Sequence, residues 1–136
     1  MAPVALGTSI TPGANAVFDS GHIAGEALTN GNLVYRDPAD SNKLKKADQT
    51  SATKAQVFGV VIGTVASGSQ VLVQTKGTVT GTATLVQGEH YGISGTAGSI
   101  EPAADEGAGD FWTYVGYAPT TTSLELAIHH AAVARA

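Results

Sequence analysis

Short apolar segments alternate with turn-forming residues along most of the chain. Residues 57–65 form the most apolar segment, and its β-branched composition and short length favour a central strand over a buried helix. Near the end of the chain Leu124, Leu126 and Ile128 alternate with other residues, which places them on one face of a strand. Turn signals recur about every 8–12 residues, a spacing typical of all-β sandwiches and barrels. The pattern therefore predicts an all-β fold, a small barrel or sandwich of short antiparallel strands.

Residues 27–35 contain the strongest local turn signal. Asn30-Gly31 lies between two short apolar segments, and both residues tolerate the positive φ that a tight hairpin turn needs. This arrangement predicts a strand, a tight turn and a second strand.

The first twenty residues have a different pattern from the rest. Proline and glycine interrupt them, which excludes a helix, and five apolar residues are spaced between the breakers: Val4, Leu6, Ile10, Val17 and Phe18. Such a segment is either a disordered terminus or an extended arm that pairs with the sheet edge of a partner. We divide the chain into an extended N-terminal arm at residues 1–20, a barrel or sandwich domain at 21–128 and a tail at 129–136. The tail is expected to form a helical turn or to remain loose.

Composition excludes several classes of protein. Charged residues make up 13% of the 136 residues and the net charge is −4, whereas a nucleic-acid binder needs a basic surface. The chain has no cysteine, which removes disulfides, cysteine-ligated metals and thiol nucleophiles. No apolar run reaches the ~18–20 residues of a membrane-spanning helix. We therefore expect neither nucleic acid nor a membrane as a partner.

The sequence contains no recognisable catalytic or metal-binding motif. The four histidines are His22, His90, His129 and His130, and the last two would point to opposite faces of a strand. His90 and Ser94 would lie about 13 Å apart along a strand, beyond hydrogen-bond reach. Glycine-rich phosphate-binding loops are absent from the sequence. We predict no enzyme activity, no metal and no cofactor.

Half of the aromatic residues cluster in one predicted strand, residues 111–118. Trp112 and Tyr114 are two positions apart, so both rings would lie on one face. That geometry suits stacking on a sugar, although core or subunit-interface packing is the commoner use of such a pair.

One series of turn-and-strand signatures extends over residues 22–128. The series comprises Ile23 to Leu28 with Gly31 and Leu33 to Tyr35, Lys46 to Asp48, Val57 to Val61, Gly68 with Val71, Val73 and Gly77, Leu85 with Gly88, Tyr91 and Ser94, Val115 to Ala118, and Leu124 with Leu126. This series resembles the small capsid decoration, or cement, proteins of tailed bacteriophages.

The resemblance implies a structural virion protein made in the bacterial cytoplasm and bound to the outer surface of the capsid. Its partner would be the major capsid protein, whose neighbouring subunits it would hold together against the pressure of packaged DNA. It also implies a homo-oligomer, with a trimer favoured and a dimer as the alternative. A sugar- or receptor-binding β-module of a phage tail or fibre is the competing function.

Two sets of residues are candidates for these contacts. The arm residues Val4, Leu6, Ile10, Val17 and Phe18 would bind the capsid by strand addition, so deleting residues 2–16 should leave a folded protein that no longer binds. The apolar strand residues Val60, Ile62, Trp112 and Tyr114 would form the oligomer interface. The alternative for this second set is that it forms the core of the monomer.

Overall fold

The computed structural model describes residues 4–102 and 111–134. Their regular structure consists of strands and one short 3-10 helix, η1 at Pro38–Asp40. The strands are β1 Thr11–Pro12, β2 Val17–Ile23, β3 Leu33–Asp37, β4 Lys43–Lys46, β5 Gly59–Ile62, β6 Gln70–Thr80, β7 His90–Ile93, β8 Ile100–Pro102, β9 Phe111–Thr120 and β10 Ser123–Ala134. The predicted all-β fold is confirmed. Among the described residues no helix is long and apolar enough to cross a membrane.

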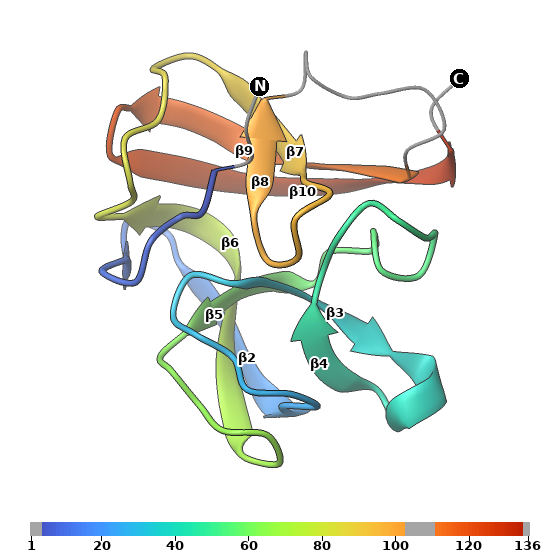
Figure 1. Ribbon diagram of the computed structural model, residues 1–136. Coiled ribbons are helices and arrows are strands. Elements are labelled where there is room, and N and C mark those ends of the chain that lie inside the picture. The colour runs from blue at the N-terminus through green and yellow to red at the C-terminus, as the bar shows by residue number, and fades with distance from the viewer. Residues whose placement is uncertain (1–3, 103–110, 135–136) are drawn as a thin grey trace.

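The strands form one curled antiparallel sheet that makes a half-barrel, in the order β4-β3-β5-β6-β10-β9-β7-β8. β1 and β2 also pair with β6, so this strand of 11 residues lies at the centre of the topology. Its first part pairs with β2 and β5, and its last part pairs with β1 and β10. β6 therefore connects the curled group β2–β6 with the second group β7–β10 (Figure 1).

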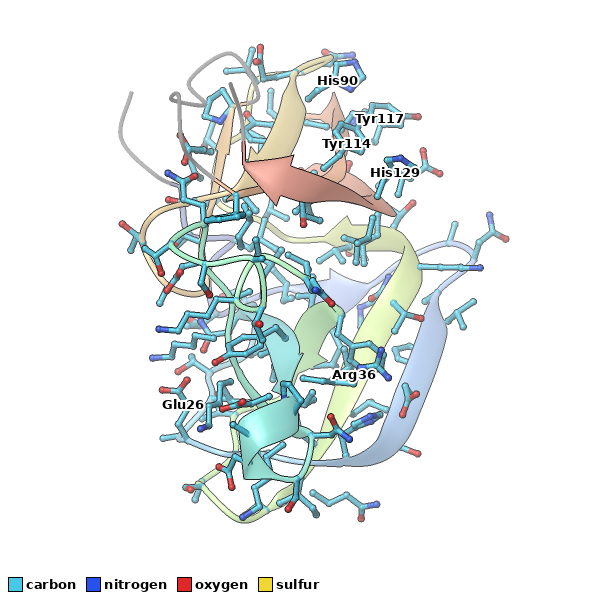
Figure 2. All side chains as sticks on the ribbon, turned by 90° about the vertical axis from the view of Figure 1, so that its right-hand side faces the viewer. Glu26, Arg36, His90, Tyr114, Tyr117 and His129 are labelled. Carbon is cyan, nitrogen blue, oxygen red and sulfur yellow. The ribbon has the colours of Figure 1, made fainter. Side chains whose placement is uncertain are left out.

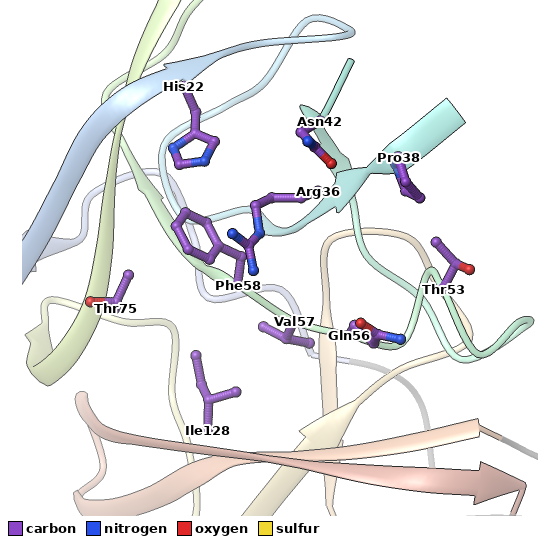
Figure 3. Close-up of a pocket in the computed structure, with 10 residues that line it drawn as sticks. All are labelled: His22, Arg36, Pro38, Asn42, Thr53, Gln56, Val57, Phe58, Thr75 and Ile128. Carbon is purple, nitrogen blue, oxygen red and sulfur yellow. The ribbon is translucent and has the colours of Figure 1, made fainter. Parts of the chain in front are cut away.

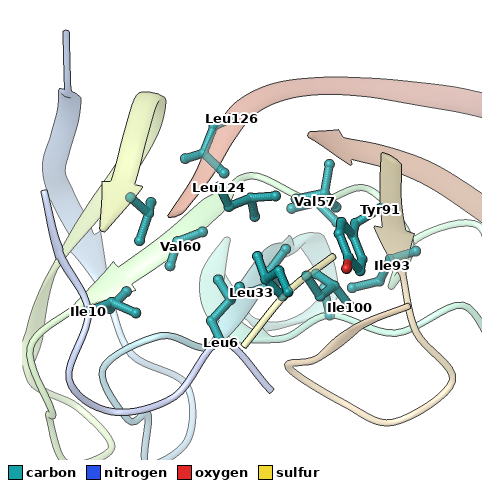
Figure 4. Packing of buried hydrophobic residues seen from close by; sticks show 14 of the residues in the cluster. Leu6, Ile10, Leu33, Val57, Val60, Tyr91, Ile93, Ile100, Leu124 and Leu126 are labelled. Carbon is teal, nitrogen blue, oxygen red and sulfur yellow. The ribbon is translucent and has the colours of Figure 1, made fainter. Parts of the chain in front are cut away.

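Two clusters of buried side chains fill the interior. The smaller lies inside the curled group and includes Val61, Val71 and Val73. The larger lies between the two groups of strands (Figure 4), and these members are labelled there: Leu6, Ile10, Leu33, Val57, Val60, Tyr91, Ile93, Ile100, Leu124 and Leu126. Valine is the commonest residue of the smaller cluster, whereas the larger cluster combines leucine, isoleucine, valine and alanine with two tyrosines.

The structure corrects the interpretation of residues 1–20 as a separate arm. Leu6 and Ile10 are 1% and 3% exposed and belong to the larger core cluster. The Val4 backbone exchanges hydrogen bonds with Ile100, and the Asn30 side chain donates to the carbonyl of Ile10. Three apolar residues of this segment, Val4, Leu6 and Ile10, pack in or against the core, so the segment is part of the domain. The boundary predicted at residue 20 falls within β2. Residues 1–3 lie outside the described part.

The predicted tail also differs from the structure. β10 continues to Ala134, with His129 opposite Tyr114 and Ala134 opposite Phe111. The expected helical turn or loose end is wrong for residues 129–134, because β9 is long enough to offer them backbone partners. Residues 135–136 lie outside the described part.

The Asn30-Gly31 turn is present, but the predicted hairpin is not. Gly31 has φ +95°, and the N–H of Asn32 donates to the carbonyl of Thr29. Leu28 pairs with Val65, however, while β3 pairs with β4 and β5. The turn therefore joins two segments that do not pair with each other.

Candidate binding surfaces

Exposed apolar side chains gather on one face of the β2–β6 pair. Val17, Phe18 and Ile23 of β2 and Leu72 of β6 are among the five large apolar residues that the described chain leaves exposed. Phe18 lies opposite Gln74 and Ile23 opposite Gln70, so the register places Leu72 between them on the same face. We call these four residues the outer apolar face.

The outer apolar face also has a free edge nearby. β2 pairs with β6 on one side, and among the described residues its other side has one bridge, from Ala24 to Leu44 just beyond its end. A strand edge without a neighbouring strand, beside exposed apolar side chains, suits the addition of a strand from another chain. Of the five predicted arm residues, Val17 and Phe18 are accessible to such a partner. Leu6 and Ile10 are not, and Val4 is half-buried against the core.

The predicted oligomer-interface residues separate into different environments. Val60 is fully buried in the larger cluster, so its assignment to an interface is wrong and the alternative of monomer core is confirmed for it. Ile62 is half-buried and packs against the same cluster. Tyr114 lies half-buried on β9, whereas the side chain of Trp112 lies outside the described part.

Tyr114 belongs to an aromatic patch on β7, β9 and β10 (Figure 2). Its hydroxyl lies 2.6 Å from Nδ1 of His90, and the His90 ring lies 5.6 Å from the Tyr114 ring and 6.0 Å from the Tyr117 ring. His129 is opposite Tyr114 across the β10–β9 pair. Interaction with the Glu125 carboxylate raises the pKa of Tyr117, and burial raises that of Tyr114. The patch is polar and hydrogen-bonded, unlike the outer apolar face.

Sequence reasoning missed His90 as a neighbour of these tyrosines. The pairing of β7 with β9 puts His90 opposite Tyr117, and only the register of that pairing brings the two together. The spacing of two residues between Trp112 and Tyr114 predicts that they share a face of β9, but it does not predict which strand pairs with β9.

A cleft of about 550 Å³ opens among β2, β3, β6 and β10 (Figure 3). The guanidinium carbon of Arg36 lies 4.7 Å from the centre of the Phe58 ring, a cation–π distance. The His22 ring lies 4.8 Å from the same ring. Nδ1 of His22 lies 3.0 Å from the Asp19 carboxylate, whose pKa is lowered by hydrogen bonds from the Gly21 N–H and from His22. No motif in the sequence predicts this cleft, because its residues come from segments far apart along the chain.

The lysine-rich strand β4 is paired internally. Nζ of Lys45 lies 2.8 Å from Asp37 and 3.2 Å from Asp40, and Lys43 lies 3.8 Å from Asp40. The hydrogen bond from Lys45 lowers the pKa of Asp37, which also accepts from the Ala39 N–H at the start of η1. These carboxylates stabilise a turn and neutralise Lys43 and Lys45.

The described residues contain no group of three or more His, Cys, Asp or Glu side chains placed to hold a metal ion. The geometry thus defines a small all-β protein with an outer apolar face, an aromatic patch and a polar cleft. No protein-family model and no curated protein matches the chain.

Proposed function

We propose that this protein binds the outer surface of a tailed-bacteriophage capsid and cements neighbouring major capsid subunits. The observation that carries the proposal is the outer apolar face beside the free edge of β2. Large apolar side chains that remain exposed on a chain with 13% charged residues are suited to burial against another protein. The resemblance of residues 22–128 to capsid decoration proteins supplies the identity of that partner.

The proposed mechanism is mechanical. Each copy would bury about 800 Å² per partner if its contact with the capsid were of ordinary size. We propose a homo-oligomer, preferably a trimer, because linked copies that bind together hold far better than one copy alone. Among the residues whose side chains the structure describes, Tyr114 is the remaining candidate for the oligomer contact. Ile62 is half-buried, so only part of its side chain is accessible to another copy.

The outer apolar face gives a direct test. We expect the double variant Phe18→Ser and Leu72→Ser to bind DNA-filled capsids at least tenfold more weakly, because both side chains would lose apolar burial at the contact. Co-sedimentation with purified capsids measures the bound copy number against protein concentration. Circular dichroism of the free variant checks that the fold is retained.

Val86 offers a matched control for this experiment. It is 60% exposed and apolar but lies outside the outer apolar face, so Val86→Ser should bind as the unmodified protein does. Equal binding by the double variant and the control would reject the outer apolar face as the capsid contact. Failure of the unmodified protein to bind any capsid in stoichiometric amount would contradict the function itself.

The aromatic patch favours a second candidate, the sugar- or receptor-binding module of a phage tail or fibre. Tyrosine rings beside histidine form a surface on which a sugar ring could stack and hydrogen-bond. In that case a glycan array should give binding that Tyr114→Ala abolishes and that Phe18→Ser leaves unchanged. Glycan binding retained by Tyr114→Ala would contradict this second candidate.

A further inference from the structure

Arg36 is a cation held in a concave site with its hydrogen-bonding capacity available. Its guanidinium stacks on Phe58, and none of the ion pairs between described residues includes it. Stacking fixes the plane of the guanidinium, and its five N–H donors lie in that plane as a rigid fork. A planar fork of this kind matches the two oxygens of a carboxylate.

The surroundings of Arg36 combine neutral polar groups with apolar surface. The cleft is lined by the amides of Asn42 and Gln56, by the hydroxyl of Thr53 and by Thr75, whose hydroxyl donates to the Val17 carbonyl. Apolar surface comes from Phe58, Val57, Pro38 and Ile128. Amides and hydroxyls suit the hydroxyls of a sugar, while apolar side chains suit its C–H faces.

The backbone that presents Asn42 is held in an unusual conformation. Ser41 and Asn42 have φ values of 55° and 59°, two consecutive left-handed residues without glycine. The N–H of Asn42 donates to the carbonyl of Asp37 and so holds the turn that places the amide at the cleft. Backbone strain of this kind concentrates at binding sites, where surrounding structure maintains it.

The charge near the cleft favours an anion of single charge. The positive charge of Arg36 contributes to lowering the pKa of Asp19, so a carboxylate already lies within electrostatic reach of the guanidinium. The Asp19 carboxylate also lies 3.0 Å from Nδ1 of His22, which is one of the residues that line the cleft. A dianionic phosphate would be repelled by Asp19 more strongly than a carboxylate of single charge.

We propose that this cleft binds an acidic sugar, with the sugar's carboxylate on Arg36 and its hydroxyls on the amide and hydroxyl groups opposite. A cleft of about 550 Å³ is large enough for one sugar unit. The site is independent of capsid binding, because His22 and Thr75 alternate along their strands with the residues of the outer apolar face.

Titration with glucuronate, followed by backbone amide chemical shifts, tests the proposal. Saturating shifts should appear at Arg36, Gln56 and Phe58. Glucose, which lacks the carboxylate, should bind at least tenfold more weakly. Acetate, which lacks the sugar ring, and glucose 6-phosphate should also bind more weakly than glucuronate. Arg36→Gln should weaken glucuronate binding at least tenfold. Arg36→Lys should bind glucuronate more tightly than Arg36→Gln but more weakly than the unmodified protein, because lysine keeps the charge and lacks the planar fork.

Lys76→Gln is the matched control, since it removes one positive charge from an exposed position of β6 that does not line the cleft. It should bind glucuronate as the unmodified protein does. Four results would overturn the proposal: absence of saturable glucuronate binding, equal binding of glucose, equal or tighter binding of acetate or glucose 6-phosphate, or retention of affinity by a folded Arg36→Gln variant. None of these outcomes depends on whether the protein binds capsids.

Discussion

Replacing Gly77 with alanine should destabilise the fold by about 3 kcal/mol or more. Gly77 has φ +89°, and a Cβ at this position would lie 2.6 Å from the amide nitrogen of Ala16 and against the carbonyl of Asn15. The substitution combines a left-handed backbone with a collision against another backbone segment that cannot rotate away. Gly77 is also where β6 passes from one group of strands to the other, so relief of the collision would disturb both.

Gly63→Ala separates the two contributions. Gly63 has φ +96°, yet a Cβ there would meet no atom within 4 Å. Only the cost of the left-handed backbone conformation remains, so the free energy of unfolding should fall by about 1–2 kcal/mol. Urea unfolding of the two variants side by side measures the difference. Similar losses in both would show that the approach of residues 15–16 to β6 contributes nothing, contrary to the geometry.

The strands that local pattern predicts are those in which an apolar, β-branched segment is bounded by turn formers. Residues 57–65 contain β5. The alternation of Leu124, Leu126 and Ile128 predicts one shared face, and all three pack in or against the larger core cluster. The pairing of strands was not predictable in the same way. Asn30-Gly31 has the sequence of a hairpin turn, but Leu28 pairs with Val65 because the curled sheet offers it that partner.

The candidate sites depend on pairing even more strongly. Phe58 and Arg36 are 22 residues apart, and they meet because residues on β3 and the chain entering β5 are neighbours in the sheet. The spacing of residues along the chain does not predict the contact between Arg36 and Phe58. The apolar residues of the first twenty were recognised as contact residues, yet spacing alone could not show which ones contact the protein's own core. Leu6 and Ile10 do so, whereas Val17 and Phe18 face solvent.

Leu6 is one of the buried residues of the N-terminal segment, and its side chain contributes to the core. Leu6→Ala should destabilise the protein by about 2–5 kcal/mol, since a fully buried leucine loses both its transfer free energy and its close packing. Deletion of residues 2–16 should be still more damaging, because it also removes Ile10, strand β1 and the hydrogen bonds of Val4 with Ile100. The expectation that this truncation folds normally is therefore replaced by the expectation that it does not.

Phe18→Ser distinguishes a folding effect from a binding effect in the same segment. Phe18 is 44% exposed and lies outside both core clusters, so its replacement should change the free energy of unfolding by much less than Leu6→Ala does. Thermal unfolding of the two variants and of the truncated chain provides the comparison. A truncated chain that unfolds cooperatively near the temperature of the full chain would restore the idea of a separable arm. If instead the truncated chain unfolds and Phe18→Ser does not, the truncated chain would lose capsid binding because it is unfolded. Its loss of binding would then carry no information about the contact surface, and the serine variants would be the decisive test of that surface.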